Sequence, residues 1–187
     1  MPAATSPPEH LRQEVQNVLI SEAEIARRVR ELATEIERDY TDKELLMVAL
    51  LTGTVPFLAD LMRHVTLPLR LDFMGVSSYG DDTAPGELVF TKELRLEARD
   101  RDVLLVDDIL DTGQTLHAVL GKLTDLQPRS LKTCVLLEKT SRRRESVTAD
   151  YVGFDVPDEF VVGYGLDYAE RYRNLPFIGV LKPEVYA

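Results

Sequence analysis

The residues best suited to carry out chemistry are three aspartates in the stretch VLLVDDILDTGQTL, residues 103–116. Four apolar residues lead directly into Asp107 and Asp108, and Asp111 follows. Such an apolar run predicts a buried strand, and ligands of an open α/β sheet bind beyond the carboxyl ends of its strands. The three carboxylates therefore stand where a ligand would be expected.

The residues after Asp111 are suited to hold a phosphate group. Gly113 lets the backbone turn closely, and N–H groups of 111–115, with the hydroxyls of Thr112 and Thr115, would form an anion-binding nest at a helix N-terminus. No Walker A pattern is present. Carboxylates beside the nest would accept hydrogen bonds from sugar hydroxyls, and a divalent metal would reduce their repulsion. We therefore expect a ribose 5-phosphate site. The alternative is an acidic surface turn whose threonine caps the next helix.

The elements around this stretch alternate between strands and helices. The pattern predicts strands at 15–20, 44–51, 69–77, 87–94, 102–108 and 130–140, helices at 22–39, from Pro56 onward and at 115–126, and short β-like pieces at 151–156, 160–167 and 177–182. This alternation implies right-handed crossovers, so we expect an α/β fold with a central, mainly parallel, twisted sheet and flanking helices. The first and last segments do not fit the alternation and should form a small hood over the sheet.

Length, charge and cysteine content limit the class of protein. The 187 residues suffice for a single domain, 1–187, with 1–10 as a flexible tail and 78–87 as a mobile loop. The formal charge of −10, from 22 Lys and Arg against 32 Asp and Glu, argues against a nucleic-acid surface. Cys134 is the only cysteine, so no internal disulfide can form and a reducing compartment is indicated. We interpret it as a small buried side chain of the core. We expect a cytoplasmic protein, because no apolar segment is long enough for a membrane span and no signal-peptide pattern occurs.

VLLVDDILDTGQTL resembles the phosphoribosyl diphosphate (PRPP) signature of the type I phosphoribosyltransferases. The stretches LDFMGVSSYG, VLLEKTSRR and VGFDVPDEFVVGYGLDYAERYRNLPFIGVLKPEVY resemble the hypoxanthine-guanine phosphoribosyltransferases, so the similarity runs from about residue 44 to the end. The resemblance implies the type I phosphoribosyltransferase fold and a purine salvage reaction. The 5-phosphoribosyl group of PRPP would pass to N9 of hypoxanthine or guanine, giving IMP or GMP and pyrophosphate with Mg²⁺ as cofactor.

The resemblance also implies roles for individual residues. It implies that PRPP ribose and 5-phosphate are bound by Asp107, Asp108, Asp111, Thr112, Gly113, Gln114 and Thr115, pyrophosphate by Thr52, Gly53 and Arg173, and the purine by Lys139, Phe160 and Val161. It implies Mg²⁺ at Asp167, with Asp107 and Asp108 as further candidates, and a closing flap that begins at Ser78 and Tyr79. A surface loop without a role is the alternative for the flap.

Three of these roles have competing interpretations. The resemblance makes Asp111 the catalytic proton acceptor near purine N7, whereas a helix N-cap bonding the N–H of residue 113 or 114 is the alternative. It places Lys139 at purine O6, where an ammonium selects a 6-oxo over a 6-amino group, whereas a solvated strand-end lysine is the alternative. It implies that Phe160 stacks on the purine and that the main chain of Val161 meets its edge, whereas both would otherwise be core residues.

One position departs from the family pattern. Thr52-Gly53 stands where the family usually has Lys-Gly, in a loop that often contains a cis peptide, so the pyrophosphate subsite carries less positive charge than expected. This leaves open a catalytically weak paralogue. A xanthine-preferring enzyme of the same class and a PRPP-sensing regulator that binds nucleic acid are also compatible with the fold. The family commonly forms dimers or tetramers, so the resemblance implies a homodimer or homotetramer.

Overall fold

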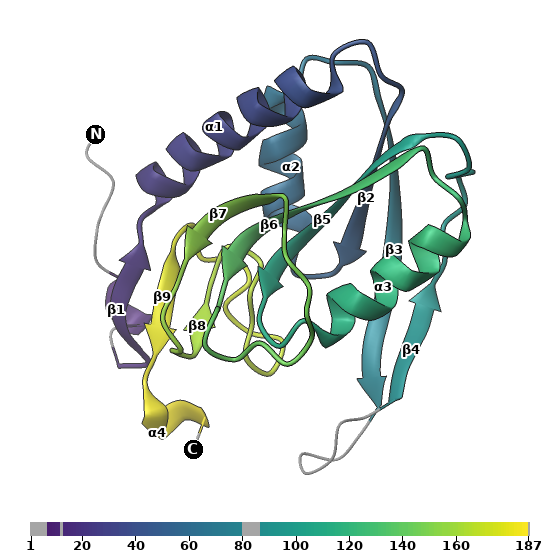
Figure 1. Ribbon diagram of the computed structural model, residues 1–187. Helices are drawn as coiled ribbons and strands as arrows, with labels where there is room; N and C mark the ends of the chain where they lie inside the picture. The colour runs from purple at the N-terminus through teal and green to yellow at the C-terminus, as the bar shows by residue number, and fades with distance from the viewer. Residues whose placement is uncertain (1–6, 12, 80–86, 187) are drawn as a thin grey trace.

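The protein is described by a computed structural model covering residues 7–11, 13–79 and 87–186. Its main sheet has six strands in the order β4-β3-β2-β5-β6-β7 (Figure 1). The strands are β2 (Leu45–Leu51), β3 (Leu69–Tyr79), β4 (Glu87–Lys92), β5 (Asp102–Leu110), β6 (Ser130–Glu138) and β7 (Tyr151–Asp155). All neighbours pair in parallel except β3 and β4. The predicted α/β fold with a mainly parallel sheet is confirmed.

Helices cover both faces of this sheet. Helices α1 (Glu22–Tyr40) and α2 (Val55–His64) lie on one face, and α3 (Gln114–Asp125) lies on the other (Figure 1). Strand β2 shows why its sequence is apolar throughout: Met47 and Ala49 pack with α1 and α2, whereas Leu46 and Val48 pack with α3. Alternate residues thus reach two separate cores.

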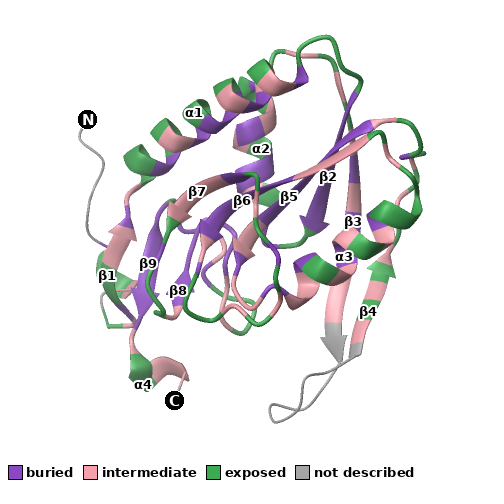
Figure 2. Ribbon diagram, in the orientation of Figure 1, coloured by how far each residue is buried: buried purple, intermediate pink, exposed green. Residues whose placement is uncertain are grey.

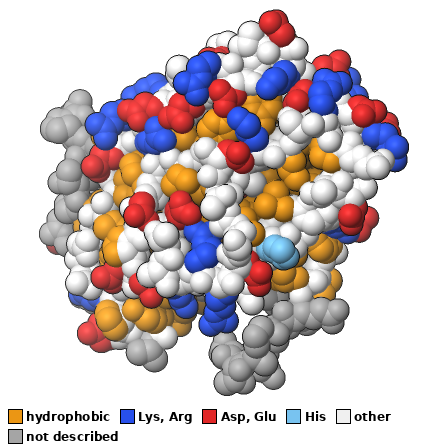
Figure 3. Space-filling model, viewed as in Figure 1, with side chains coloured by type: hydrophobic (Ala, Val, Ile, Leu, Met, Phe, Trp, Pro, Cys, Tyr) orange, Lys and Arg blue, Asp and Glu red, His pale blue; other side chains and the backbone are white. Residues whose placement is uncertain are grey.

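Helix α1 is amphipathic and begins with the capping box that the sequence suggests. The Ser21 hydroxyl accepts a bond from the Glu24 N–H, and the Glu24 carboxylate accepts one from the Ser21 N–H. The buried side of the helix faces the sheet (Figure 2), and its exposed side carries mixed acidic and basic side chains rather than a basic surface (Figure 3). No helix of the described residues is long and apolar enough to cross a bilayer.

The two chain ends form the predicted hood. Strands β1 (Val15–Ile20), β9 (Ile178–Leu181) and β8 (Val161–Val162) make an antiparallel sheet in the order β1-β9-β8. The predicted β-like piece 160–167 was too long, because only two of its residues form a strand. The chain then turns through Gly163, Tyr164 and Gly165, all with positive φ.

Other boundaries also differ from the sequence prediction, and two of them, the ends of β5 and β3, concern predicted site residues. Strand β5 runs to Leu110 instead of 108, so Asp108 lies two residues before the end of the strand rather than at its last position. Strand β3 runs through Ser78 to Tyr79, two residues past its predicted end at 77, because both residues pair with β4. Residues 80–86 and the tail residues 1–6 lie outside the described residues, so the mobile loop and flexible tail stay predictions.

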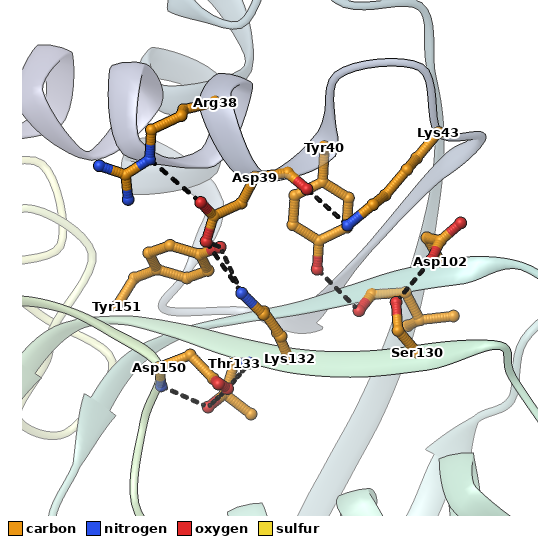
Figure 4. Close-up of polar contacts among 11 residues, drawn as sticks. Arg38, Asp39, Tyr40, Lys43, Asp102, Ser130, Lys132, Thr133, Asp150 and Tyr151 are labelled. Atoms are coloured by element: carbon orange, nitrogen blue, oxygen red, sulfur yellow. Dashed lines mark hydrogen bonds and ion pairs between the residues drawn. The ribbon is translucent and has the colours of Figure 1, made fainter.

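A polar network fixes the end of α1 against the amino ends of the sheet strands (Figure 4). The Asp39 carboxylate accepts hydrogen bonds from Lys132 Nζ at 2.9 Å and from the Tyr151 hydroxyl at 2.7 Å, while the Tyr40 hydroxyl donates to the Val103 carbonyl. The bonds from Lys132 and Tyr151 hold the pKa of Asp39 well below its ordinary value. This network fixes the amino ends of β5, β6 and β7, at the opposite end of the sheet from the acidic carboxyl end of β5.

Asp72 of β3 is a buried carboxylate that organises the chain after β4. It accepts hydrogen bonds from the N–H groups of Phe73, Arg95 and Leu96 and from Lys92 Nζ. Burial alone would raise its pKa, but the backbone bonds and Lys92 outweigh burial and lower the pKa to about 2. A carboxyl with a depressed pKa stabilises the fold above its unfolded-state pKa and loses that effect as the pH falls.

The pH dependence of unfolding tests this account of Asp72. Between about pH 5 and pH 3, the free energy of unfolding of the wild type should fall by about 1 kcal/mol more than that of Asp72→Asn. The exposed Asp125, replaced by Asn, should keep the wild-type dependence. Urea unfolding at each pH measures the three slopes, and a wild-type slope equal to that of Asp72→Asn would contradict the assignment.

Candidate functional site

The end of β5 places two carboxylates in a confined position. Asp107 is buried, and its Oδ1 accepts hydrogen bonds from the Thr54 hydroxyl at 3.2 Å and from the Asp108 N–H at 3.0 Å. Burial and the adjacent charge of Asp108 raise the pKa of Asp107 well above its ordinary value, and burial raises the pKa of Asp108. A pair of this kind is favourable only if donors or a cation meet it.

The turn after β2 comes up against this pair. The Leu51–Thr52 peptide is cis, and Gly53 lies so near Asp108 that a Cβ there would clash with Asp108 Oδ2. A cavity of about 200 Å³ is bounded by this turn, the acidic pair and Thr115. Thr52 and Gly53, predicted to bind pyrophosphate, are thus brought beside the residues predicted to bind ribose. Thr54, which the sequence prediction missed, supplies the hydroxyl that satisfies Asp107.

The start of α3 has the form expected of an anion site. Gly113, at φ 87°, precedes the helix and provides no side-chain cap, and a Cβ there would be strained. The Thr112 hydroxyl accepts one long bond, 3.5 Å, from the Gln114 N–H. Thr115, in the first turn of α3, lines the cavity. The first N–H groups of a helix have no partner within the helix, so they can bind an anion. Phosphate binding here stays a prediction.

Asp111 lies in the loop between β5 and α3. Its Oδ2 accepts a bond from Arg142 at 3.4 Å, whereas its Oδ1 is buried with no hydrogen-bond partner among the described residues. The N-cap of α3 is Gly113 instead of Asp111, so the structure does not show the capping alternative. Asp111 Oδ1 therefore keeps a hydrogen-bonding capacity that no described residue uses.

Lys139 follows β6 and is buried, which contradicts the solvated alternative. Its Nζ donates to the Glu159 carbonyl at 2.7 Å, and its backbone N–H donates to the Leu110 carbonyl at 2.9 Å. One residue therefore joins the acidic loop to the segment that leads into β8. Its ammonium is thus held next to Glu159, the residue that directly precedes Phe160 and Val161.

Phe160 and Val161 have separate surroundings. Phe160 is only partly buried and stacks on Tyr186 of α4 (Pro183–Tyr186), with ring centroids 4.6 Å apart, and meets Tyr168 edge-on at 5.5 Å. Val161 pairs with Val180 in the hood sheet. No local pattern indicated Tyr186, because it is far from Phe160 in the sequence and meets it only through the pairing of β8 with β9.

Asp167 and Arg173, predicted to bind different ligands, bind each other in this structure. Arg173 Nη1 lies 2.9 Å from Asp167 Oδ1 and also donates to the Gly165 carbonyl at 2.9 Å. A Cβ on Gly165 would clash with the Gly53 carbonyl oxygen, so this loop presses on the turn after β2. Arg173 and Asp167 are therefore tied to the loop that packs on Gly53, the glycine beside Asp108, and a ligand of either residue would have to replace their mutual bond.

Comparison with known proteins agrees with this geometry. Residues 17–169 match the sequence model of a protein family, the phosphoribosyl transferase domain. A hypoxanthine-guanine phosphoribosyltransferase of Bacillus subtilis (strain 168) is 48% identical over 94% of this chain and 98% of its own length. This chain belongs to the hypoxanthine-guanine phosphoribosyltransferases.

Solved structures support membership in the hypoxanthine-guanine phosphoribosyltransferases. A hypoxanthine phosphoribosyltransferase of Staphylococcus aureus has a TM-score of 0.91 and 43% identity, covering 96% of this chain and 98% of that one. A Trypanosoma cruzi hypoxanthine phosphoribosyl transferase, studied for the role of its C-terminal region in oligomeric state and activity, has a TM-score of 0.89 and 39% identity, covering 96% and 97%. The type I phosphoribosyltransferase fold is thereby confirmed.

The contact between Gly53 and Asp108 in this phosphoribosyltransferase leads to a stability prediction. Gly53→Ala should lower the free energy of unfolding by about 1–3 kcal/mol, because the added Cβ cannot be accommodated beside Asp108. Gly121→Ala is the matched control, since a Cβ on this α3 residue meets nothing within 4 Å. That change should raise stability by about 0.5–1 kcal/mol. Equal effects of both substitutions in denaturant unfolding would contradict the close approach.

Proposed function

We propose that this protein transfers the 5-phosphoribosyl group of PRPP to N9 of hypoxanthine or guanine, giving IMP or GMP and pyrophosphate in purine salvage. The observation that carries the proposal is the packing of three segments against one another, with Gly53 between the other two. They are the turn at Gly53, the strand end at Asp107 and Asp108, and the loop from Gly165 to Arg173. Two relatives that are 48% and 42% identical to this chain, and are covered over nearly their whole length, are named hypoxanthine-guanine phosphoribosyltransferases.

The acidic strand end would hold the sugar. Asp107 and Asp108 accept hydrogen bonds from the two ribose hydroxyls. Burial raises the pKa of both carboxyls, and these donors would stabilise their charged forms. The N–H groups and hydroxyls of Thr112–Thr115 receive the 5-phosphate at the start of α3. Thr52, Gly53 and Arg173 receive the pyrophosphate. The sugar develops positive charge as this group departs, so fixed positions for both ends matter more than covalent help from the protein.

Mg²⁺ fits this donor set. No group of three His, Cys, Asp or Glu side chains arranged for a metal occurs in residues 7–11, 13–79 and 87–186. Mg²⁺ commonly takes only one or two protein carboxylates and completes its shell with water and substrate phosphate oxygens. Asp167 would hold it, with Asp107 and Asp108 as further candidates. When bound, the ion neutralises charge on the leaving pyrophosphate.

The other side of the site would hold the purine. The buried Lys139 ammonium donates to O6, Phe160 stacks on the ring, and the main chain of Val161 meets its edge. Oδ1 of Asp111, which lacks a partner among the described residues, accepts the proton at N7. Lys139 only donates hydrogen bonds, so a 6-amino group would leave two donors facing each other, a penalty of about 1–3 kcal/mol.

Turnover with four bases tests the function. In the presence of PRPP and Mg²⁺, hypoxanthine and guanine should be converted to nucleotides and adenine should not. Preferential use of xanthine would support the xanthine-preferring alternative. A PRPP-sensing nucleic-acid regulator is disfavoured by the charge of −10 and the presence of Asp111. Nucleic-acid binding in a gel shift without any turnover would overturn the transferase assignment.

Oligomeric state and location complete the proposal. A homodimer or homotetramer and a cytoplasmic location are expected from the family resemblance and the sequence. The C-terminal region of the similar Trypanosoma cruzi enzyme was studied for its part in oligomeric state, and the corresponding α4 here packs on Phe160. Sedimentation equilibrium of the full chain would distinguish a monomer from these assemblies.

Asp111→Asn should lower kcat by about 10- to 1000-fold with PRPP binding largely kept, because the amide cannot accept the N7 proton. Steady-state kinetics with guanine gives kcat, and calorimetric titration with PRPP gives the affinity. Near-normal turnover would remove Asp111 as the proton acceptor.

Thr52→Lys should lower the KM for PRPP, because a lysine restores the positive charge that this pyrophosphate subsite lacks. Thr52 is exposed, so the longer side chain can be accommodated. An exposed position at the opposite end of the sheet strands, Thr66→Lys, adds the same charge away from the site as a control. A KM that is unchanged by Thr52→Lys would show that main-chain groups suffice for pyrophosphate.

A further inference from the structure

Arg142 occupies a position between two carboxylates of different loops. Its Nη1 lies 3.4 Å from Asp111 Oδ2, and its Nε lies 3.6 Å from Asp158 Oδ1. Asp111 belongs to the loop between β5 and α3, and Asp158 belongs to the segment between β7 and β8. The guanidinium therefore bridges the two segments between which the purine is proposed to bind.

The loop that carries Arg142 is itself fixed at both sides. Its first residue, Lys139, donates to the Glu159 carbonyl, next to Asp158. Further along, the N–H groups of Arg144 and Glu145 donate to the Thr112 carbonyl at 2.9 and 3.1 Å. Because Thr112 follows Asp111, the backbone of this loop already holds Arg142 opposite Asp111. The Arg142 side chain therefore starts from a backbone position that is already close to Asp111.

The two oxygens of Asp111 are unequal as a result. Oδ2 is paired with Arg142, whereas Oδ1 is buried without a partner among the described residues. An unpaired buried carboxylate oxygen is unfavourable unless a donor arrives. A purine N–H at N7 is such a donor. Fixing one oxygen by an arginine therefore determines which oxygen remains for the base.

We propose that Arg142, anchored by Asp158, is a positioning residue that holds Asp111 by Oδ2 so that Oδ1 faces N7 of the purine. This inference rests on the proposed function. The planar guanidinium suits the task, because its separate N–H groups meet two carboxylates at once, whereas a lysine ammonium retains the charge without that fork. Arg142 acts through Asp111, and this role needs no contact with PRPP.

Kinetics of three loop variants test the role. Arg142→Gln should lower kcat with guanine by about tenfold while the KM for PRPP stays within about twofold of wild type. Arg142→Lys should recover part of the loss. Arg144→Gln is the matched control, because it removes an exposed arginine two positions away and should leave kcat unchanged. Thermal unfolding of all three variants verifies that they fold.

A double-mutant cycle separates positioning from a general structural effect. If Arg142 acts through Asp111, Arg142→Gln in an Asp111→Asn background should cause no further loss of kcat. A loss of the same size in both backgrounds would overturn the inference, as would an Arg142→Gln enzyme as fast as Arg144→Gln. These results concern Arg142 alone when the wild type converts guanine. Absence of turnover by the wild type with any base would instead overturn the proposed function.

Discussion

The site depends on the close approach of a glycine backbone to a buried acidic pair. Strands β2 and β5 are parallel neighbours at the centre of the sheet, so their carboxyl ends reach the same edge. Gly53 can lie against Asp108 only because it has no side chain, and Thr54 then reaches Asp107. Moving this turn outward by the size of a methyl group would open the wall of the cavity. It would also remove the hydroxyl that satisfies Asp107.

The sheet and the hood contribute different halves of the site. The sheet supplies the acidic strand end and the start of α3, which suit a phosphorylated sugar. The hood supplies Phe160 and Val161, which suit a flat base. Lys139 connects these halves through its bond to Glu159, and Gly165 connects them through its contact with Gly53. The Gly165 contact is between main-chain atoms and the Lys139 side chain is buried, so these two links do not depend on exposed side chains.

Local patterns in the sequence were enough to predict the architecture. The apolar run of β2, the capping box of α1 and the switch from strand to helix at Gly113 each depend on residues a few positions apart, so they predict the sheet, its flanking helices and the acidic strand end. The hood was expected only in outline. Its β8 is two residues long, because positive-φ residues from Gly163 onward end the strand.

Long-range contacts were beyond the reach of those patterns. Nothing near Arg173 indicated that it would pair with Asp167, and nothing near Lys139 indicated burial against Glu159. Arg142 stands in the charged stretch SRRRES, and its partners Asp111 and Asp158 are distant in the sequence, so no local pattern indicates them. The roles of the individual residues came from resemblance, and the structure adds which of them lie together.

The central claim is that the carboxylates at the end of β5 bind the sugar of PRPP beside a magnesium ion. Calorimetric titration of PRPP into the wild type and into an Asp107→Asn/Asp108→Asn variant, with and without Mg²⁺, tests it most directly. The account predicts saturable uptake by the wild type with Mg²⁺ and a large loss of affinity in the variant. Equal affinity of both proteins, or no uptake by the wild type with Mg²⁺ present, would contradict it.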